Sequence, residues 1–190
     1  VLRVAGIEDL PEEIFGPVLH VATFKSDELG KVIAAINASG YGLTFGLHTR
    51  ISSRVRHLAE QVHAGNIYVN RNQIGAVVGS QPFGGEGLSG TGPKAGGPHY
   101  LQRFTRAGQT QLQAAPLSLP GPTGESNVLH VAPRGTLLCL GPSEDDVAAQ
   151  KAMAAAAGCR AEIAAFDGEA LQAAAGFEAV AWFGDSAGLG

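Results

Sequence analysis

Three segments of this 190-residue chain combine residue types that could bind a charged small molecule. The first, residues 12–17, holds two carboxylates, a phenylalanine and a Gly-Pro turn. A carboxylate can accept two hydroxyl hydrogen bonds, as from a ribose, and a neighbouring ring can pack on a flat heterocycle. The alternative interpretation is a solvated acidic turn with Phe15 inserted in the core. The residue types alone leave both interpretations open.

The second segment, residues 75–97, contains nine glycines in 23 positions. Glycine tolerates positive φ and close backbone approach, so successive N–H groups can converge on an anion without a cationic side chain. A long structural loop packed against another domain or subunit would explain the same composition. The third segment, residues 121–127, is compatible with a phosphate-contacting turn, although a linker turn is the simpler interpretation.

A complete catalytic apparatus is not visible in the sequence. Cys139 lies in an apolar stretch and Cys159 follows a helix, and we interpret both as structural thiols. The six histidines show no metal-ligand spacing, so no metal site is predicted. Residues 184–188 match Gly-x-Ser-x-Gly, but the acid and histidine of such hydrolases would have to follow, and a turn is the better interpretation. No catalytic residue is assigned.

Composition predicts a globular protein, with 45% hydrophobic and 16% charged residues. The formal charge of -4 provides no basic surface of the kind that nucleic acid requires, so no nucleic-acid partner is expected. Two cysteines cannot form a disulfide scaffold, which favours a reducing compartment, the cytoplasm. No apolar run approaches the roughly 20 residues of a membrane helix, and peripheral membrane association remains compatible with these data.

Hydrophobic spacing predicts alternating strands and helices in the first 114 residues. The predicted elements are a buried strand at 17–24, a helix at 29–36, a strand at 43–49, a helix at 52–62 and a strand at 66–70. This order predicts crossover connections and a mostly parallel sheet.

The sequence also indicates which residues begin and end the two predicted helices. Ser26 or Asp27 is expected to cap the first helix, and Gly40 to end it. Ser52 or Ser53 is expected to cap the second, and Gly65 to end it in a left-handed conformation. The apolar residues expected to face inward on the second helix are Val55, Leu58, Ala59 and Val62.

The rest of the chain repeats this order and differs in charge. Residues 1–114 carry a net charge of +2 and residues 115–190 a net charge of -6. We predict a linker at 115–127, because three prolines lie between 116 and 122. Beyond it, strands are expected at 136–140, 161–166 and 179–183, with helices at 143–157 and 169–175. So few strands form a marginal sheet, and we expect both ends of the chain to continue in a longer polypeptide.

Four ordered motifs resemble the C-terminal part of aldehyde dehydrogenases. They are EIFGP at 13–17, YGLTFGL at 41–47, GNIYVN at 65–70 and QPFGG at 81–85. GAVVG at 75–79 and SGTGPKAGGP at 89–98 resemble the L-glutamate γ-semialdehyde (Δ1-pyrroline-5-carboxylate) dehydrogenases, above all that module of the bifunctional proline utilization A flavoenzymes.

The resemblance implies an α/β fold in two parts. Residues 1–114 would form the C-terminal part of the catalytic domain, with a mostly parallel sheet and crossover helices. Residues 128–190 would begin a second, Rossmann-like domain of the aldehyde-dehydrogenase type. The partners so implied are an upstream dinucleotide-binding domain and a proline dehydrogenase domain that holds FAD outside this chain, in an enzyme expected to be a homo-oligomer.

The resemblance also implies roles for five residues. Glu13 would hold the nicotinamide ribose of NAD, and Phe15 would pack near the nicotinamide. The backbone N–H groups of Gly75 and Ala76 would bind the α-carboxylate of L-glutamate γ-semialdehyde, and Phe83 would lie along its methylene chain.

The implied reaction is attack of a cysteine thiolate on the aldehyde, hydride transfer to NAD+ and hydrolysis of the thioester to glutamate. The cysteine, its supporting asparagine and the general-base glutamate would lie before Val1, so this segment alone is expected to be inactive. The alternative hypothesis is a non-catalytic dehydrogenase-like module used for assembly or for covering an active site.

Overall fold

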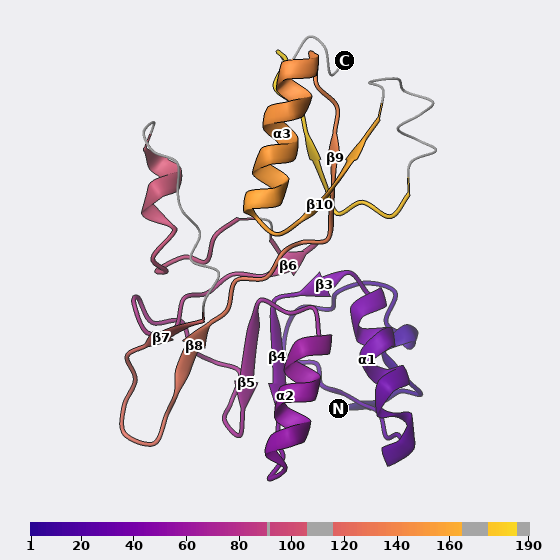
Figure 1. The fold of residues 1–190 in the computed structure, drawn as a ribbon. Helices are drawn as coiled ribbons and strands as arrows, with labels where there is room; N and C mark the ends of the chain where they lie inside the picture. The colour runs from indigo at the N-terminus through magenta and orange to yellow at the C-terminus, as the bar shows by residue number, and fades with distance from the viewer. Residues whose placement is uncertain (91, 106–115, 165–174, 186–190) are drawn as a thin grey trace. The chain divides into compact units, whose positions relative to one another are not determined.

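The computed structural model describes residues 1–90, 92–105, 116–164 and 175–185 of the chain (Figure 1). They divide into two compact units. Unit 1 takes its described residues from 1–110 and 119–127, and unit 2 from 111–118 and 128–190. Strand pairings are mostly parallel and alternate with helices along the chain, so the prediction of an α/β fold is confirmed.

Unit 1 contains a strand–helix–strand crossover. β4 (Thr44–Leu47) pairs in parallel with β5 (Asn66–Val69), from Thr44 opposite Asn66 to Leu47 opposite Val69, and α2 (Ser52–Gln61) connects them (Figure 1). Leu58 and Tyr68 of these elements, and Val62 just after α2, are buried. The predicted order of strand, helix and strand is therefore confirmed.

Three details of α2 differ from the prediction. Ala59 is exposed, because it lies on the outer side of the helix from Leu58. No serine side chain caps the helix, and Ile51 is the N-cap residue. α2 ends at Gln61 with Val62 extended, so Gly65 is not its left-handed stop. Gly65 is a glycine for another reason, since a Cβ there would overlap the Gly84 carbonyl oxygen.

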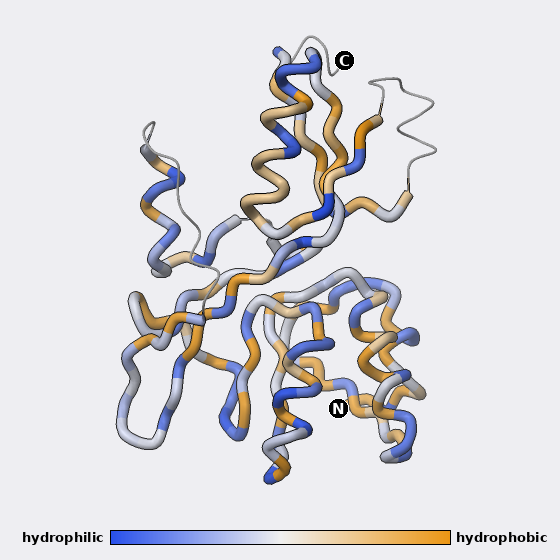
Figure 2. Tube along the Cα trace, in the orientation of Figure 1, coloured by the Kyte–Doolittle hydropathy of each residue, from blue (hydrophilic) through white to orange (hydrophobic). Residues whose placement is uncertain are grey.

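The α1 helix (Leu29–Ala38) forms where predicted. It follows a 3-10 turn at Ser26–Glu28, and the cap bond runs from the Lys25 backbone N–H to Glu28 Oε2 at 3.2 Å, not from Ser26 or Asp27. Gly40, with φ +75°, lies just beyond its end, as predicted. Figure 2 shows hydrophilic and hydrophobic residues interspersed along α1 and α2, as expected for helices with one covered side.

The predicted buried strand at 17–24 is wrong in length and in burial. Only β2 (His20–Val21) is a strand, and it pairs in parallel with β1 (Leu2–Arg3). Leu19, Val21 and Phe24 are exposed. A strand of apolar residues becomes buried only when other elements cover both of its faces, and the described residues leave these side chains uncovered.

Unit 2 contains a three-stranded parallel sheet in the order β10-β9-β11. The strands are β9 (Thr136–Cys139), β10 (Arg160–Ile163) and β11 (Ala179–Ala181). α3 (Glu144–Ala156) connects β9 to β10, and Ser143 Oγ caps it by accepting from the Asp146 N–H at 3.2 Å. These three strands and this helix confirm the prediction, whereas the helix predicted at 169–175 lies almost wholly outside the described residues.

The remaining elements are short. They are 3-10 turns at Ile7–Asp9 and Leu101–Phe104, β3 (Tyr41–Gly42) paired antiparallel with β6 (Glu86–Gly87), and β7 (Leu117–Leu119) paired with β8 (Asn127–Leu129). Within the described part of the chain, no helix is long and apolar enough to cross a membrane.

Candidate functional site

The acidic turn at 12–17 leaves its functional groups exposed. The Phe15 side chain is 83% exposed, so the interpretation that inserts Phe15 in the core is not supported by the described residues. Gly16 turns the chain with φ +94° before Pro17. Glu13 has no hydrogen-bond or ion-pair partner among the described residues, so its carboxylate is free to accept hydroxyl hydrogen bonds.

Side chains shape the glycine-rich segment 75–97 by binding its backbone. Lys94 Nζ donates to the carbonyl oxygens of Gly65 and Gly84, the latter at 2.8 Å. Burial lowers the pKa of Lys94, and the nearby Glu86 partly opposes this shift. The Phe83 and Ala95 backbones exchange two hydrogen bonds of 3.0 and 2.9 Å. Phe83 therefore has a fixed backbone position within this segment.

Asn66, at the start of β5, binds the same segment from its other side. Its Nδ2 donates to the Pro82 carbonyl oxygen at 2.9 Å, and its Oδ1 accepts from the Gly84 N–H at 3.1 Å. The close approach of Gly65 to Gly84 completes this contact. The GNIYVN motif thus positions the QPFGG motif through backbone contacts that only a glycine and an amide side chain permit.

The loop at 75–81, which holds two of the predicted site residues, folds back on itself. Val77 and Gln81 exchange backbone hydrogen bonds of 3.0 and 2.8 Å, and Gly79 donates to the Gly96 carbonyl oxygen at 2.9 Å. Ala76 is exposed. A Cβ on Gly75 would lie 2.5 Å from Gln81 Oε1 and 3.1 Å from Arg71 Nη2, so a larger residue here would require the ends of these two side chains to shift.

Two side chains bind the carbonyl oxygens that flank this loop. The buried Tyr68 hydroxyl donates to the Gly75 carbonyl oxygen at 2.7 Å, and Arg71 Nη2 donates to the Ile74 carbonyl oxygen at 3.2 Å. By contrast, the N–H groups of Gly75 and Ala76 have no partner among the described residues. The loop therefore presents two adjacent, unpartnered backbone donors.

Arg71 is a cation beside the predicted carboxylate site that the sequence reasoning missed. Its Nη1 forms an ion pair with Glu125 Oε2 at 2.8 Å, and its guanidinium carbon lies 5.5 Å from the centre of the Tyr68 ring. Glu125 Oε1 also accepts from Gln81 Nε2 at 2.7 Å. Sequence separation concealed this contact, because Arg71 and Glu125 lie 54 residues apart.

Glu125 belongs to the segment 121–127, whose interpretation the sequence left open. Asn127 Nδ2 donates to Glu125 Oε1 at 3.1 Å and to the Pro120 carbonyl oxygen at 3.0 Å. The hydrogen bond from Asn127, with those from Gln81 and the charge of Arg71, lowers the pKa of Glu125, against a smaller effect of burial. Because its pKa is lowered, Glu125 favours the negatively charged form, which would repel a phosphate.

The five predicted site residues lie in two groups. Gly75, Ala76 and Phe83 lie on one glycine-rich segment, whereas Glu13 and Phe15 lie on the N-terminal turn. Between described residues, no hydrogen bond or ion pair joins the two groups. The first group thus forms one framework, and the second is a separate exposed turn.

Cysteine and metal chemistry have little support in the structure. Cys139 is fully buried in β9, and burial raises the pKa of its thiol against the smaller influence of Lys151. A buried thiol with a raised pKa is a poor nucleophile. No group of three or more candidate metal ligands occurs among the described residues. The Gly-x-Ser-x-Gly serine lies outside them.

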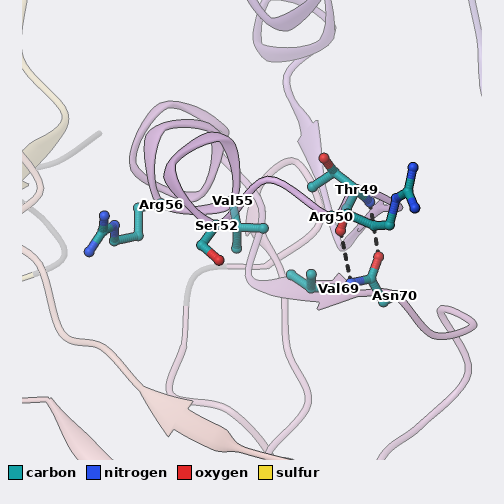
Figure 3. Close-up of a pocket in the computed structure, with 7 residues that line it drawn as sticks. All are labelled: Thr49, Arg50, Ser52, Val55, Arg56, Val69 and Asn70. Carbon is teal, nitrogen blue, oxygen red and sulfur yellow. Dashed lines mark hydrogen bonds between the residues drawn. The ribbon is translucent and has the colours of Figure 1, made fainter.

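A separate open cavity of about 400 Å³ lies where β4 and β5 end and α2 begins (Figure 3). Thr49 and Asn70 close one side of it through two hydrogen bonds, of 2.9 and 3.0 Å. The guanidinium groups of Arg50 and Arg56 lie on opposite sides of the cavity and do not converge (Figure 3). None of the predicted site residues lines this cavity.

Comparison with known proteins places this geometry in a family. The aldehyde dehydrogenase family model matches residues 8–110, a range that contains all five predicted site residues. The chain belongs to the aldehyde dehydrogenase family. Glu125, the ion-pair partner of Arg71, lies outside the matched range.

Curated aldehyde dehydrogenase relatives cover part or most of this chain. The bifunctional protein PutA of Klebsiella aerogenes is 41% identical over 209 aligned positions, which cover 83% of this chain and 16% of the relative. The 1-pyrroline-5-carboxylate dehydrogenase of Bacillus subtilis is 47% identical over 92 positions, which cover 48% of this chain and 18% of the relative. The chain therefore spans less than a fifth of the length of these relatives.

Solved structures of proline utilization A are also similar to this chain. Proline utilization A from Corynebacterium freiburgense superposes with a TM-score of 0.67 at 29% identity, covering 81% of this chain and 20% of that one. Proline utilization A from Bradyrhizobium japonicum superposes with a TM-score of 0.53 at 58% identity, covering 54% of this chain and 10% of that one. These likenesses confirm the predicted family and fold.

Proposed function

We propose that this chain is part of an NAD+-dependent dehydrogenase that oxidises L-glutamate γ-semialdehyde to L-glutamate in proline catabolism. Its role is to bind the α-carboxylate of the substrate and one face of the coenzyme. The observation that carries the proposal is the pair of unpartnered N–H groups at Gly75 and Ala76, in an exposed loop of the family-matched range. The names of the relatives, PutA and 1-pyrroline-5-carboxylate dehydrogenase, support the substrate class.

The carboxylate site uses backbone dipoles. Two adjacent N–H groups can donate to the two oxygens of one carboxylate, and a charged acceptor roughly doubles the strength of such bonds. Ala76 leaves room for the ligand, because its side chain is a single methyl group. Phe83, fixed by its two bonds to Ala95, offers an apolar surface for the methylene chain of the substrate.

The coenzyme site uses the turn at 12–17. NAD, when bound, supplies the acceptor for the hydride that leaves the aldehyde carbon. The unpartnered Glu13 carboxylate fits the role of acceptor for ribose hydroxyls, and the exposed Phe15 ring fits that of a surface for the nicotinamide. These two side chains would orient the coenzyme, and neither takes part in proton transfer.

The complete enzyme requires other domains. We propose that the cysteine nucleophile and the dinucleotide-binding domain lie elsewhere in the same protein, together with a proline dehydrogenase domain that holds FAD. The word bifunctional in the name of the PutA relatives supports the last of these. A homo-oligomer in the cytoplasm is part of the same proposal.

Replacement of Ala76 by glutamate tests the carboxylate site in the complete enzyme. The new carboxylate would occupy the site and repel the substrate, so KM for L-glutamate γ-semialdehyde should rise at least tenfold, about 1.4 kcal/mol of lost binding. Ala59→Glu, an exposed position on α2, is the matched control and should leave KM unchanged. Unchanged kinetics in Ala76→Glu would instead favour the non-catalytic role in assembly.

Replacement of Phe15 by alanine tests the coenzyme site. Because Phe15 is 83% exposed, its loss should change the free energy of unfolding by no more than about 0.5 kcal/mol. The apparent KM for NAD+ should rise about fivefold in steady-state kinetics. A loss of stability well above about 0.5 kcal/mol, with an unchanged KM for NAD+, would instead indicate a structural role for Phe15.

A further inference from the structure

The proposed carboxylate site raises the question of what directs its two N–H groups. A loop of small residues has many backbone conformations, and glycine has the most. In a free loop, the N–H groups of Gly75 and Ala76 would have to be ordered at each binding event, at a cost in conformational entropy. The structure contains bonds that remove this cost.

The peptide plane links each N–H to the carbonyl that precedes it. In a trans peptide, the C=O of one residue and the N–H of the next point in opposite directions within one rigid plane. Fixing the Ile74 carbonyl therefore fixes the direction of the Gly75 N–H. Fixing the Gly75 carbonyl fixes the Ala76 N–H in the same way.

Both carbonyls are fixed, by two different side chains. Arg71 Nη2 donates to the Ile74 carbonyl oxygen at 3.2 Å, and the Tyr68 hydroxyl donates to the Gly75 carbonyl oxygen at 2.7 Å. Tyr68 lies in β5 and is 6% exposed, so its ring cannot shift without disturbing the core of unit 1. The two N–H groups consequently point away from Tyr68 and Arg71.

Arg71 is itself held by a residue from the segment 121–127. Its Nη1 is 2.8 Å from Glu125 Oε2, which leaves Nη2 free for the Ile74 carbonyl. Glu125 Oε1 is in turn held by Gln81 at 2.7 Å and by Asn127 at 3.1 Å. Gln81 also closes the loop through its backbone pairing with Val77. The carboxylate of Glu125 thus joins the guanidinium to the far end of the same loop.

We infer that Tyr68 and Arg71 are positioning residues, which bind the carbonyl oxygens of Gly75 and Ile74 and so direct two backbone N–H groups at the carboxylate of the substrate, with Glu125 holding Arg71 in place. This inference rests on the proposed function. Tyr68 and Arg71 do not touch the substrate. They set the affinity for aldehydes that carry a carboxylate and leave the reaction of the aldehyde group itself unaffected.

The test compares two substrates in the complete enzyme. L-glutamate γ-semialdehyde carries the carboxylate and propanal does not. Tyr68→Phe removes one hydroxyl and keeps the ring, and Arg71→Met removes the guanidinium and keeps most of the stem. For each variant, KM for the semialdehyde should rise about tenfold, because one N–H would no longer be directed at the substrate carboxylate and its charge-assisted hydrogen bond would weaken. kcat for the semialdehyde and both constants for propanal should stay within twofold.

Matched variants separate positioning from general stability. Tyr41→Phe removes a hydroxyl from an exposed tyrosine and should leave all four constants unchanged. Arg71→Lys keeps the charge and should recover part of the affinity lost in Arg71→Met. The recovery should be incomplete, because one ammonium cannot bind Glu125 and the Ile74 carbonyl in the geometry of the guanidinium. If Tyr68→Phe failed to fold, the comparison of Arg71→Lys with Arg71→Met would decide the question.

Three results would overturn the inference in distinguishable ways. Equal losses with both substrates would show a merely structural role for Tyr68 and Arg71. No loss with either substrate, while Ala76→Glu still raises KM for the semialdehyde, would refute the positioning role and leave the proposed function intact. No effect of Ala76→Glu either would refute the carboxylate site itself, and with it the proposed function.

Discussion

The loop at 75–81 of unit 1 and the β9–α3 loop of unit 2, residues 140–143, differ in whether their backbone N–H groups have hydrogen-bond partners. Each lies within an α/β unit and contains a glycine, Gly75 or Gly141. In unit 1, the N–H groups of Gly75 and Ala76 have no partner among the described residues. In unit 2, Gly141 N–H donates to Gln150 Oε1 at 3.1 Å and Ser143 N–H to Asp146 Oδ2 at 3.1 Å.

Acidic side chains add a second difference between the two loops. The β9–α3 loop lies at the carboxyl end of the central strand, between β10 and β11, the place where open α/β sheets bind ligands. There the first turn of α3 carries Glu144, Asp145 and Asp146, which suit the helix dipole and would repel a phosphate or a carboxylate. The fold class alone therefore does not indicate a ligand site. The presence of an anion site depends on whether backbone N–H groups lack partners and on the charges that surround them.

The largest effect should come from Lys94→Met, which removes the cation that binds two carbonyl oxygens of the glycine-rich framework. The carbonyls of Gly65 and Gly84 would lose their partner, so unit 1 should lose about 2–4 kcal/mol of stability. Native-state hydrogen exchange measures this loss separately for each unit, and unit 2 should be unaffected. Lys31→Met, at an 83% exposed side chain, is the control. Equal destabilisation by both variants would contradict the role given to Lys94.

A smaller effect is expected from Gln150→Leu in unit 2. Gln150 is fully buried, and its Oε1 and Nε2 bind the N–H and the carbonyl of Gly141 at 3.1 and 2.8 Å. Leucine of similar size would leave both backbone groups unsatisfied, at about 2 kcal/mol. Hydrogen exchange of β9 and α3 should quicken, while the kinetic constants for the semialdehyde stay unchanged. A loss of affinity for the semialdehyde would show that the two loops do not differ in function as argued.

The smallest effect concerns the protonation of Glu125. In the folded protein, the bonds from Asn127 and Gln81 and the charge of Arg71 lower the pKa of Glu125 below its ordinary value of 4.5. Its carboxylate therefore contributes stability that is fully present above pH 4.5 and is lost as pH falls through the lowered pKa. A carboxyl carbon NMR titration should show its midpoint below 4.5. Arg71→Met should move that midpoint upward, and an unmoved midpoint would contradict the ion pair.

The regular elements were predictable because short-range patterns determine them. The stripe in α2, the Ser143 cap of α3 and the apolar runs of β5 and β9 each need only local sequence to be recognised. The strand at 17–24 was predicted wrongly, because apolar composition indicates what could be buried and not what covers it. Gly65 was likewise assigned to a helix end, although its real constraint comes from Gly84, 19 residues away in sequence.

The candidate site could be predicted only in part, for the same physical reason. The motifs identified the loop with Gly75 and Ala76, but they gave no sign of the side chains that orient it. Tyr68 looks like an ordinary core residue of a strand, and its hydroxyl bond to the Gly75 carbonyl exists only in the folded chain. Arg71 and Glu125 are brought together across 54 residues, a distance over which no spacing rule operates.

The most direct test of the proposed carboxylate site is a crystal structure of the complete enzyme with L-glutamate bound. The two oxygens of the α-carboxylate should lie within hydrogen-bond distance, about 2.7–3.2 Å, of the backbone nitrogens of Gly75 and Ala76. Tyr68 and Arg71 should retain their bonds to the carbonyls behind them. An α-carboxylate bound instead by a cationic side chain, with the two N–H groups turned away or filled by water, would contradict the proposed site.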